Sequence, residues 1–249
     1  MLKLVSEYRV FDWIHYLGFA LLGMAFQKTC ALYLFPFVAL LLAYAYSLNN
    51  FYDLRKKSKV FLYPLIISLP FFLLLNFIQI FISLLFLFMV TTYSARTFNV
   101  KNKKIISTIY NAFSFTLIFF LALFVIEDFS LRILLLSLFF FLLNLVAQFV
   151  HEICHFEKDR RQKTLNTTVA YGKKFSMKLS FISLILVIPV SGTLLFFHFV
   201  NVLFFVVSTI FSIYFAVKIF TTKIDSKFRK SYKKFGILAG FIFFISTFI

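Results

Sequence analysis

The sequence has 249 residues, of which 62% are hydrophobic, and its 26 basic and 9 acidic residues give a formal net charge of +17 at pH 7. A mean hydropathy of +0.95 excludes an ordinary soluble domain, in which about half of the residues are apolar. The two cysteines, Cys30 and Cys154, lie in or beside apolar runs and indicate neither a disulfide framework nor a cysteine zinc site. The composition therefore predicts a multi-pass membrane protein.

Apolar runs predict the helices. A hydrocarbon core of about 30 Å needs roughly 20 apolar residues per helix. Runs of that kind predict nine membrane spans, at residues 10–27, 30–54, 60–76, 78–98, 106–126, 129–156, 175–195, 199–221 and 232–249. The third and fourth runs are almost continuous, and the turn between them is placed near Asn76–Gln79. No run alternates with the period of two that a membrane β-strand requires, so the predicted fold is all-α, a single membrane domain over residues 1–249.

The basic residues support this number of spans. With nine spans, every Lys and Arg except Lys28 and Arg132 falls on the side of the membrane that holds the N-terminus. The positive-inside rule makes that side cytoplasmic, with the C-terminus on the other side of the cell membrane. Because the basic residues are spread over helix ends at one membrane face, they indicate topology and membrane lipid as a partner, and do not predict binding to nucleic acid.

Acidic residues gather at the cytoplasmic ends of the second and sixth predicted helices, as Asp53, Glu152, Glu157 and Asp159. A carboxylate that enters the membrane is costly and usually marks a site, so two helix ends with acids at the same depth suggest a shared cavity. Asn49 lies one turn before Asp53 on the same helix face. Oxygen ligands within a basic rim are typical of a magnesium and diphosphate site. The simpler alternative is that these charges only anchor helix ends at the interface.

The segment from His151 to His155 also has the H-E-x-x-H spacing, with which a helix can place two imidazoles on one zinc ion and a glutamate as base. A third ligand would have to come from another helix. His198 lies on the opposite side in the predicted topology, and His15 lies only about one turn into the first helix, which leaves Asp53. Since three fixed positions often arise by chance, an intramembrane zinc protease is the less favoured alternative.

Three segments resemble, in order and spacing, the motifs of the UbiA family of intramembrane prenyltransferases. NNFYDLRKK at residues 49–57 is similar to the first aspartate-rich motif, N-D-x-x-D-x-x-x-D. YSARTFNVK at residues 93–101 resembles the Tyr-Ser…Lys motif after the fourth helix. EICHFEKDRRQKTLNTTVAYG at residues 152–172 resembles the second motif, E-I-x-D-x-E-x-D with a basic stretch, Thr-Leu and Gly behind it. The resemblance implies a nine-helix bundle around a central lipid cavity.

This resemblance implies an enzyme that ionises a polyprenyl diphosphate and transfers the prenyl carbon to a lipophilic acceptor, such as an aromatic ring, a quinone or a glycerol lipid. In the family's chemistry, carboxylate-bound Mg2+ holds the diphosphate and basic residues stabilise its departing charge. A ring face attracts a cation, so Tyr93 could sit near the allylic cation. The predicted metal ligands are Asn49, Asp53, Glu157 and Asp159; the predicted diphosphate contacts are Asn49, Arg55, Ser94, Lys101 and Arg160; the predicted catalytic residues are Asp53, Tyr93 and Asp159.

The sequence departs from the family pattern at three ligand positions. Asn50 stands where the family has Asp, Lys57 replaces the last Asp of the first motif, and His155 replaces the first Asp of the second. The Arg-Pro segment that usually follows the first motif is missing. Lys57 could supply by its own charge what one metal would otherwise supply. These differences are compatible with one or two magnesium ions, and with a second interpretation, a degenerate member that binds isoprenoid lipid without transferring it.

Overall fold

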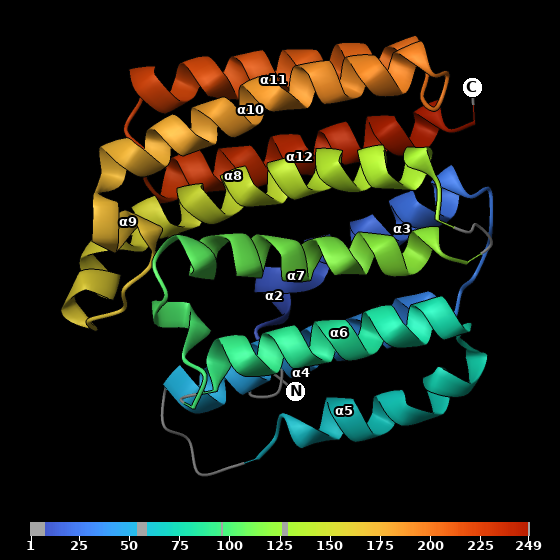
Figure 1. Ribbon diagram of the computed structural model, residues 1–249, viewed down its shortest axis with the longest axis horizontal. Helices are drawn as coiled ribbons and strands as arrows, with labels where there is room; N and C mark the ends of the chain where they lie inside the picture. Colours follow the sequence, from blue (N-terminus) through green and yellow to red (C-terminus); the bar gives the residue numbers. More distant parts are fainter. Residues whose placement is uncertain (1–7, 54–58, 96, 126–128, 249) are drawn as a thin grey trace. The chain divides into compact units, whose positions relative to one another are not determined.

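The structure is a computed structural model that describes residues 8–53, 59–95, 97–125 and 129–248. Regular structure in these residues is helical, apart from one isolated β-bridge between Lys104 and Asn166. The chain divides into two compact units (Figure 1). The first unit is Met1–Val100 with Leu117–Asp128, and the second is Lys101–Thr116 with Phe129–Ile249. The helix α7, Ile105–Leu123, contributes its first part to the second unit and its last part to the first.

The first unit is built around a long apolar helix, α4. Its elements are α2 (Val10–Trp13), η1 (Ile14–Tyr16), α3 (Leu17–Phe26), α4 (Leu34–Asp53), α5 (Leu62–Ser68), η2 (Leu69–Leu74) and α6 (Phe77–Ser94). The α4 helix packs against α3, α5 and α6. Its apolar residues Leu34, Phe37 and Leu41 are almost fully buried by these contacts. Burial of such side chains on several sides holds the first turns of α4 within the packed unit.

A capping box starts α6 where the sequence predicts the turn between two spans. The Asn76 side chain accepts from the Gln79 backbone N–H at 2.8 Å, and the Gln79 side chain accepts from the Asn76 N–H at 3.1 Å. Their side-chain amides donate to the last turn of α7, at Phe124 O (2.6 Å) and Leu121 O (3.1 Å). Polar groups in an apolar setting need such partners. The predicted turn near Asn76–Gln79 is confirmed.

The second unit packs its helices around the longest one. After the first part of α7 come α8 (Leu131–Arg161), α9 (Thr167–Tyr171), α10 (Lys173–Phe196), α11 (Val202–Thr221) and α12 (Ser226–Ser246). The α8 helix packs against α10 and α12, and α10 against α11. Phe139, Phe204 and Phe243 join α8, α11 and α12, with ring centroids 4.3 to 5.8 Å apart. Gly172, with φ of +86°, makes the turn from α9 into α10.

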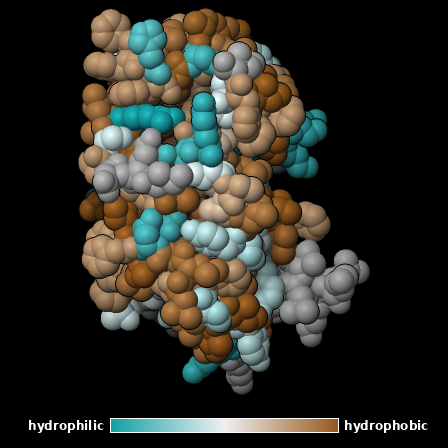
Figure 2. All heavy atoms as spheres, turned by 90° about the vertical axis from the view of Figure 1, so that its right-hand side faces the viewer, coloured by the Kyte–Doolittle hydropathy of each residue, from teal (hydrophilic) through white to brown (hydrophobic). Residues whose placement is uncertain are grey.

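Six of the described helices are long and apolar enough to cross a membrane, namely α4, α6, α7, α8, α10 and α11. The other three predicted spans are helical as well. Residues 10–26 and 62–74 form the shorter segments α2 to α3 and α5 to η2, and α12 begins with a charged turn. Hydrophobic side chains cover much of the face seen in Figure 2. A multi-pass membrane protein is thus supported, while the number nine and the orientation stay predictions.

Candidate functional site

Asn49 and Asp53 lie one turn apart on the last two turns of α4. The Oδ1 atom of Asn49 is buried and accepts no hydrogen bond from any residue that the structure describes. Leaving a buried acceptor unpaired costs about 1–3 kcal/mol, so a donor or a cation would be stabilised at this oxygen. The side chain of Asp53, at the helix end, is exposed. The predicted diphosphate residue Arg55 and the motif residue Lys57 lie outside the described residues.

Tyr93 and Ser94 form the end of α6, and both are half-buried. Two residues before Tyr93, the hydroxyl of Thr91 shares a 2.8 Å hydrogen bond with the hydroxyl of Tyr44 on α4. This bond fixes the last turns of α6 to α4. The structure therefore places Tyr93 and Ser94 on a helix that packs directly against the one that carries Asn49 and Asp53.

Asp159, near the end of α8, is held by the loop that follows it. Its Oδ2 atom accepts from Asn166 Nδ2 at 2.8 Å, and its backbone oxygen accepts from Thr164 N–H at 2.9 Å. Asn166 also caps α9, because its Oδ1 accepts from Val169 N–H at 2.9 Å. Lys101 lies close enough to Asp159 to interact with it electrostatically. The carboxylate thus has a fixed position and a neighbouring cation.

The segment that carries Lys101 is attached to this loop by its backbone. Lys104 N–H donates to Leu165 O at 2.8 Å, and Leu165 N–H donates to Asn102 Oδ1 at 3.0 Å. These bonds join the chain before α7 to the chain after α8, which are far apart in sequence. The structure therefore brings together Lys101 and Asp159, two of the predicted site residues from two different motifs.

Glu157 and Arg160 point elsewhere. The α8 helix continues to Arg161, and residues two apart on a helix do not face each other, so Glu157 lies on a different side from Asp159. Glu157 is exposed and lies 3.7 Å from Lys173 Nζ, and Arg160 is exposed too. Within the described ranges, no three His, Cys, Asp or Glu side chains form a metal-binding group. The assignment of Glu157 as a metal ligand stays a prediction without support from a neighbouring ligand.

Glu152, which matches the second motif, is almost fully buried and joins three helices. Its Oε1 accepts from Thr108 Oγ1 on α7 at 2.6 Å and from Gln148 Nε2 at 3.4 Å. Its Oε2 accepts from the backbone N–H and the hydroxyl of Thr168 on α9, both at 3.2 Å. Both oxygens are occupied, so this carboxylate holds the second unit together and does not offer a free edge to a ligand.

The H-E-x-x-H pattern is likewise used in contacts within the unit. The rings of His151 and His155 lie with centroids 4.5 Å apart. The Nη1 atom of Arg229 on α12 lies 3.2 Å from Nε2 of His155. Since a guanidinium only donates, Nε2 must accept and is not available to a zinc ion. This bond and the hydrogen bonds of Glu152 disfavour the zinc protease. Sequence reasoning missed Arg229, because no local spacing connects it to α8.

Comparison with known proteins gives matches of structure. No protein-family model and no curated protein sequence matches the chain. A digeranylgeranylglyceryl phosphate synthase structure matches with a TM-score of 0.73 and 16% identity, over 99% of this chain and 98% of that one. A UbiA homolog from Archaeoglobus fulgidus bound to GPP and Mg2+ matches with 0.80 and 15%, over 99% and 98%. The same homolog bound to DMAPP and Mg2+ matches with 0.78 and 14%, over the same shares. The chain has the fold of the UbiA family of membrane prenyltransferases.

Proposed function

We propose that the protein is a prenyltransferase, which moves a polyprenyl group from an isoprenoid diphosphate to a lipophilic acceptor at the cytoplasmic side of the cell membrane. The observation that carries the proposal is the buried Oδ1 atom of Asn49, without a described donor and one turn from the Asp53 carboxylate. Both residues match the first motif of the family. The likeness of fold to a UbiA homolog bound to GPP and Mg2+ supports it.

The side-chain oxygen atoms of Asn49, Asp53 and Asp159 suit magnesium as ligands. Mg2+ prefers oxygen ligands and is commonly bound through one or two carboxylates together with substrate phosphates. Asn49 Oδ1 and the Asp53 carboxylate are such ligands in the first unit, and the Asp159 carboxylate is one in the second. Among the described residues only Asn166 donates to the Asp159 carboxylate, and it does so at Oδ2, so Oδ1 can bind a cation. When bound, Mg2+ would neutralise charge on the diphosphate and make it a better leaving group.

The chain's own residues then have the following roles. Lys101, beside Asp159, binds the diphosphate as its negative charge grows, an electrostatic effect that is strong where water is excluded. The bond between the allylic carbon and the diphosphate oxygen breaks, and its electron pair leaves with the diphosphate. We assign stabilisation of the allylic cation to the ring of Tyr93, which lies at the end of α6. The acceptor atom forms a bond to the allylic carbon and loses a proton.

The decisive experiment uses the purified protein with Mg2+, labelled geranyl diphosphate and a membrane-lipid extract as acceptor. The wild type should release diphosphate and form a labelled lipid product. Asp53→Asn should lower the rate roughly 100-fold, because a carboxylate that acts on the leaving group is lost. Asp12→Asn is the matched control, since Asp12 is also in the first unit but pairs with Arg9 at 2.7 Å. It should leave the rate unchanged.

The same experiment separates the alternatives. Equilibrium binding of geranyl diphosphate without release of diphosphate would favour the degenerate isoprenoid-binding protein. Wild-type protein that neither binds nor cleaves geranyl diphosphate in Mg2+ would contradict the proposal. Stoichiometric zinc that is lost in His151→Ala would favour the protease instead.

A further inference from the structure

Arg229 is a half-buried cation that has no carboxylate partner among the described residues. It lies on the first turns of α12, where its backbone N–H donates to Asp225 O at 3.0 Å. Its side chain donates to Nε2 of His155 on α8 at 3.2 Å. In the described part of the chain, that is one hydrogen bond for a guanidinium with five N–H groups. Its other N–H groups have no hydrogen-bond acceptor among the described residues and can therefore bind an anion.

His155 fixes Arg229 without neutralising it. Arg229 Nη1 lies 3.2 Å from His155 Nε2, and a guanidinium can only donate, so this contact orients the guanidinium without a carboxylate. The His155 ring also packs, tilted, against the ring of His151 one turn earlier, which limits its orientation. One turn later on the same face of α8 comes Asp159, and His155 and Lys101 are both within electrostatic reach of that carboxylate. Arg229 and Lys101 therefore bring two cations from different elements to one face of α8.

We infer that Arg229 binds the diphosphate of the isoprenoid substrate and that His155 is its positioning residue. The inference rests on the proposed function. A guanidinium presents its N–H groups in a planar fork that matches two phosphate oxygens, which a lysine ammonium cannot do. His155 stands where the family pattern has an aspartate, a residue that contacts a diphosphate only through a metal. With His155 there, a fixed guanidinium supplies positive charge to the diphosphate directly.

The test is calorimetric titration of the full-length protein with inorganic diphosphate and with geranyl diphosphate, both in Mg2+. Arg229→Gln should weaken binding of both ligands roughly 10- to 100-fold. This is the loss in affinity expected when one or two charge-assisted hydrogen bonds to the diphosphate are removed. Arg229→Lys should recover only part of the loss, since the charge returns without the fork. Lys230→Gln is the matched control: its side chain is exposed next to Arg229, and it should bind like the wild type.

A double-mutant cycle tests the role of His155. His155→Ala should weaken binding by itself, but it should add little to Arg229→Gln, because His155 acts through Arg229. Equal effects in the two backgrounds would remove the positioning role.

The outcomes separate the two proposals. If the wild type binds diphosphate and Arg229→Gln binds it equally well, this inference is overturned while the proposed function stands. If Arg229→Gln lowers the melting temperature of the ligand-free protein but the folded fraction keeps the wild-type affinity, Arg229 only ties α12 to α8, and the inference is overturned as well. If the wild type binds neither ligand in Mg2+, the proposed function is contradicted, and the inference about Arg229 is overturned with it.

Discussion

At the residue scale, Glu152 and Glu157 lie on the same helix in opposite settings. Glu152 accepts hydrogen bonds on both oxygens inside the unit, whereas Glu157 is exposed beside Lys173. Glu152→Gln would turn an amide N–H₂ toward a donor, so it should lower the free energy of unfolding by about 1–3 kcal/mol. Glu157→Gln should lower it by less than about 1 kcal/mol, as for other exposed ion pairs. Chemical unfolding of both variants in detergent checks this difference, and equal losses would contradict it.

Asp225 gives a second prediction, on pH. It caps α12 by accepting from the backbone N–H groups of Phe228 and Lys227, and these bonds, Phe228 first, lower the pKa of the Asp225 carboxyl. A carboxyl with a lowered pKa stabilises the fold above its unfolded pKa, near about 3.9, and loses this effect as pH falls through the folded pKa. The melting temperature of the wild type should therefore exceed that of Asp225→Ala at pH 6.

The difference should shrink below about pH 4, where the carboxyl becomes protonated. Asp225→Asn should keep most of the capping at pH 6, because Asn is an equally good N-cap. Since the amide does not titrate, the stabilisation from this cap should not fall between pH 6 and pH 3. Scans of all three proteins between pH 3 and 6 give the comparison. A gap between the wild type and Asp225→Ala that stays constant with pH would contradict the assignment.

The sequence predicted two candidate site residues that the structure brings together, and it did so for a physical reason. Lys101 and Asp159 belong to segments whose residue types and order resemble known motifs, and the structure brings these two residues together. The role of Glu152 was not predictable, because its partner Thr108 lies 44 residues away and a buried carboxylate has the same sequence signature as a ligand. Arg229, 74 residues from His155, was missed for the same reason. Tertiary contacts between helix ends leave no periodicity in the sequence.

At the scale of elements, α3 approaches the end of α7 so closely that only glycine fits. A Cβ atom built on Gly23 would lie 2.5 Å from Ala122 Cβ and 3.1 Å from Phe119 O. Gly23→Ala should thus force the two helices apart and lower the stability by about 1–3 kcal/mol. Gly18→Ala in the same helix meets nothing within 4 Å and should be neutral or slightly stabilising. Thermal unfolding of both variants in detergent measures this; similar melting temperatures for the two would contradict the close contact.

Element positions were predicted better than element ends. Apolar runs of about 20 residues predict helices because the bilayer demands internal backbone hydrogen bonds, and each predicted span holds a helix over most of its described residues. The ends depend on local interactions that hydropathy does not sense. The α8 helix runs past 156 to Arg161 through charged residues that are good helix formers, and α12 starts at Ser226 because Asp225 caps it. The apolar run at 10–27 is interrupted by the 3-10 turn η1.

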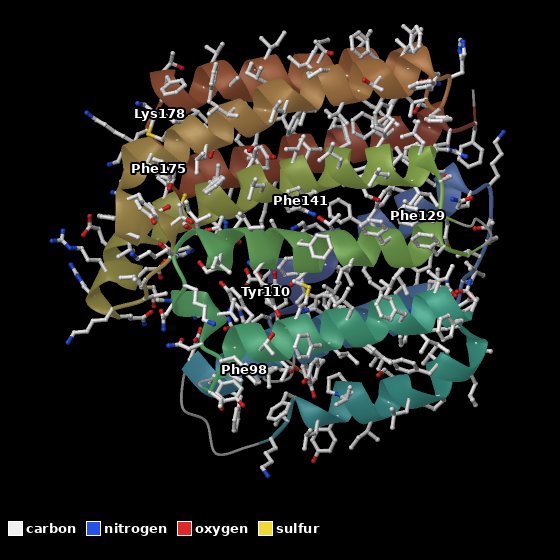
Figure 3. All side chains as sticks on the ribbon, in the orientation of Figure 1. Phe98, Tyr110, Phe129, Phe141, Phe175 and Lys178 are labelled. Carbon is white, nitrogen blue, oxygen red and sulfur yellow. The ribbon has the colours of Figure 1, made fainter. Side chains whose placement is uncertain are left out.

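At the scale of the whole molecule, charge is divided between helix ends. In the second unit, the end formed by α9 and the first turns of α10 carries exposed basic side chains; in Figure 3, Lys178 of α10 extends outward there. The basic residues exposed near this end are Lys158, Arg160, Arg161, Lys163, Lys173, Lys174 and Lys178. Translocating so many cations is unfavourable, so we predict that this end of the second unit lies in the cytoplasm.

The two native cysteines make this orientation testable. Cys30 is exposed between α3 and α4. In the predicted topology it lies on the non-cytoplasmic side, where the only basic residues are Lys28 and Arg132. In intact cells, a membrane-impermeant maleimide should therefore label Cys30 in a Cys154→Ser variant. A Gln162→Cys variant without the native cysteines should react only after permeabilisation, because an odd number of predicted spans separates the two positions and Gln162 follows α8 among the basic residues. The reverse pattern would place the basic end outside, and labelling of both from one side would require an even number of spans between them.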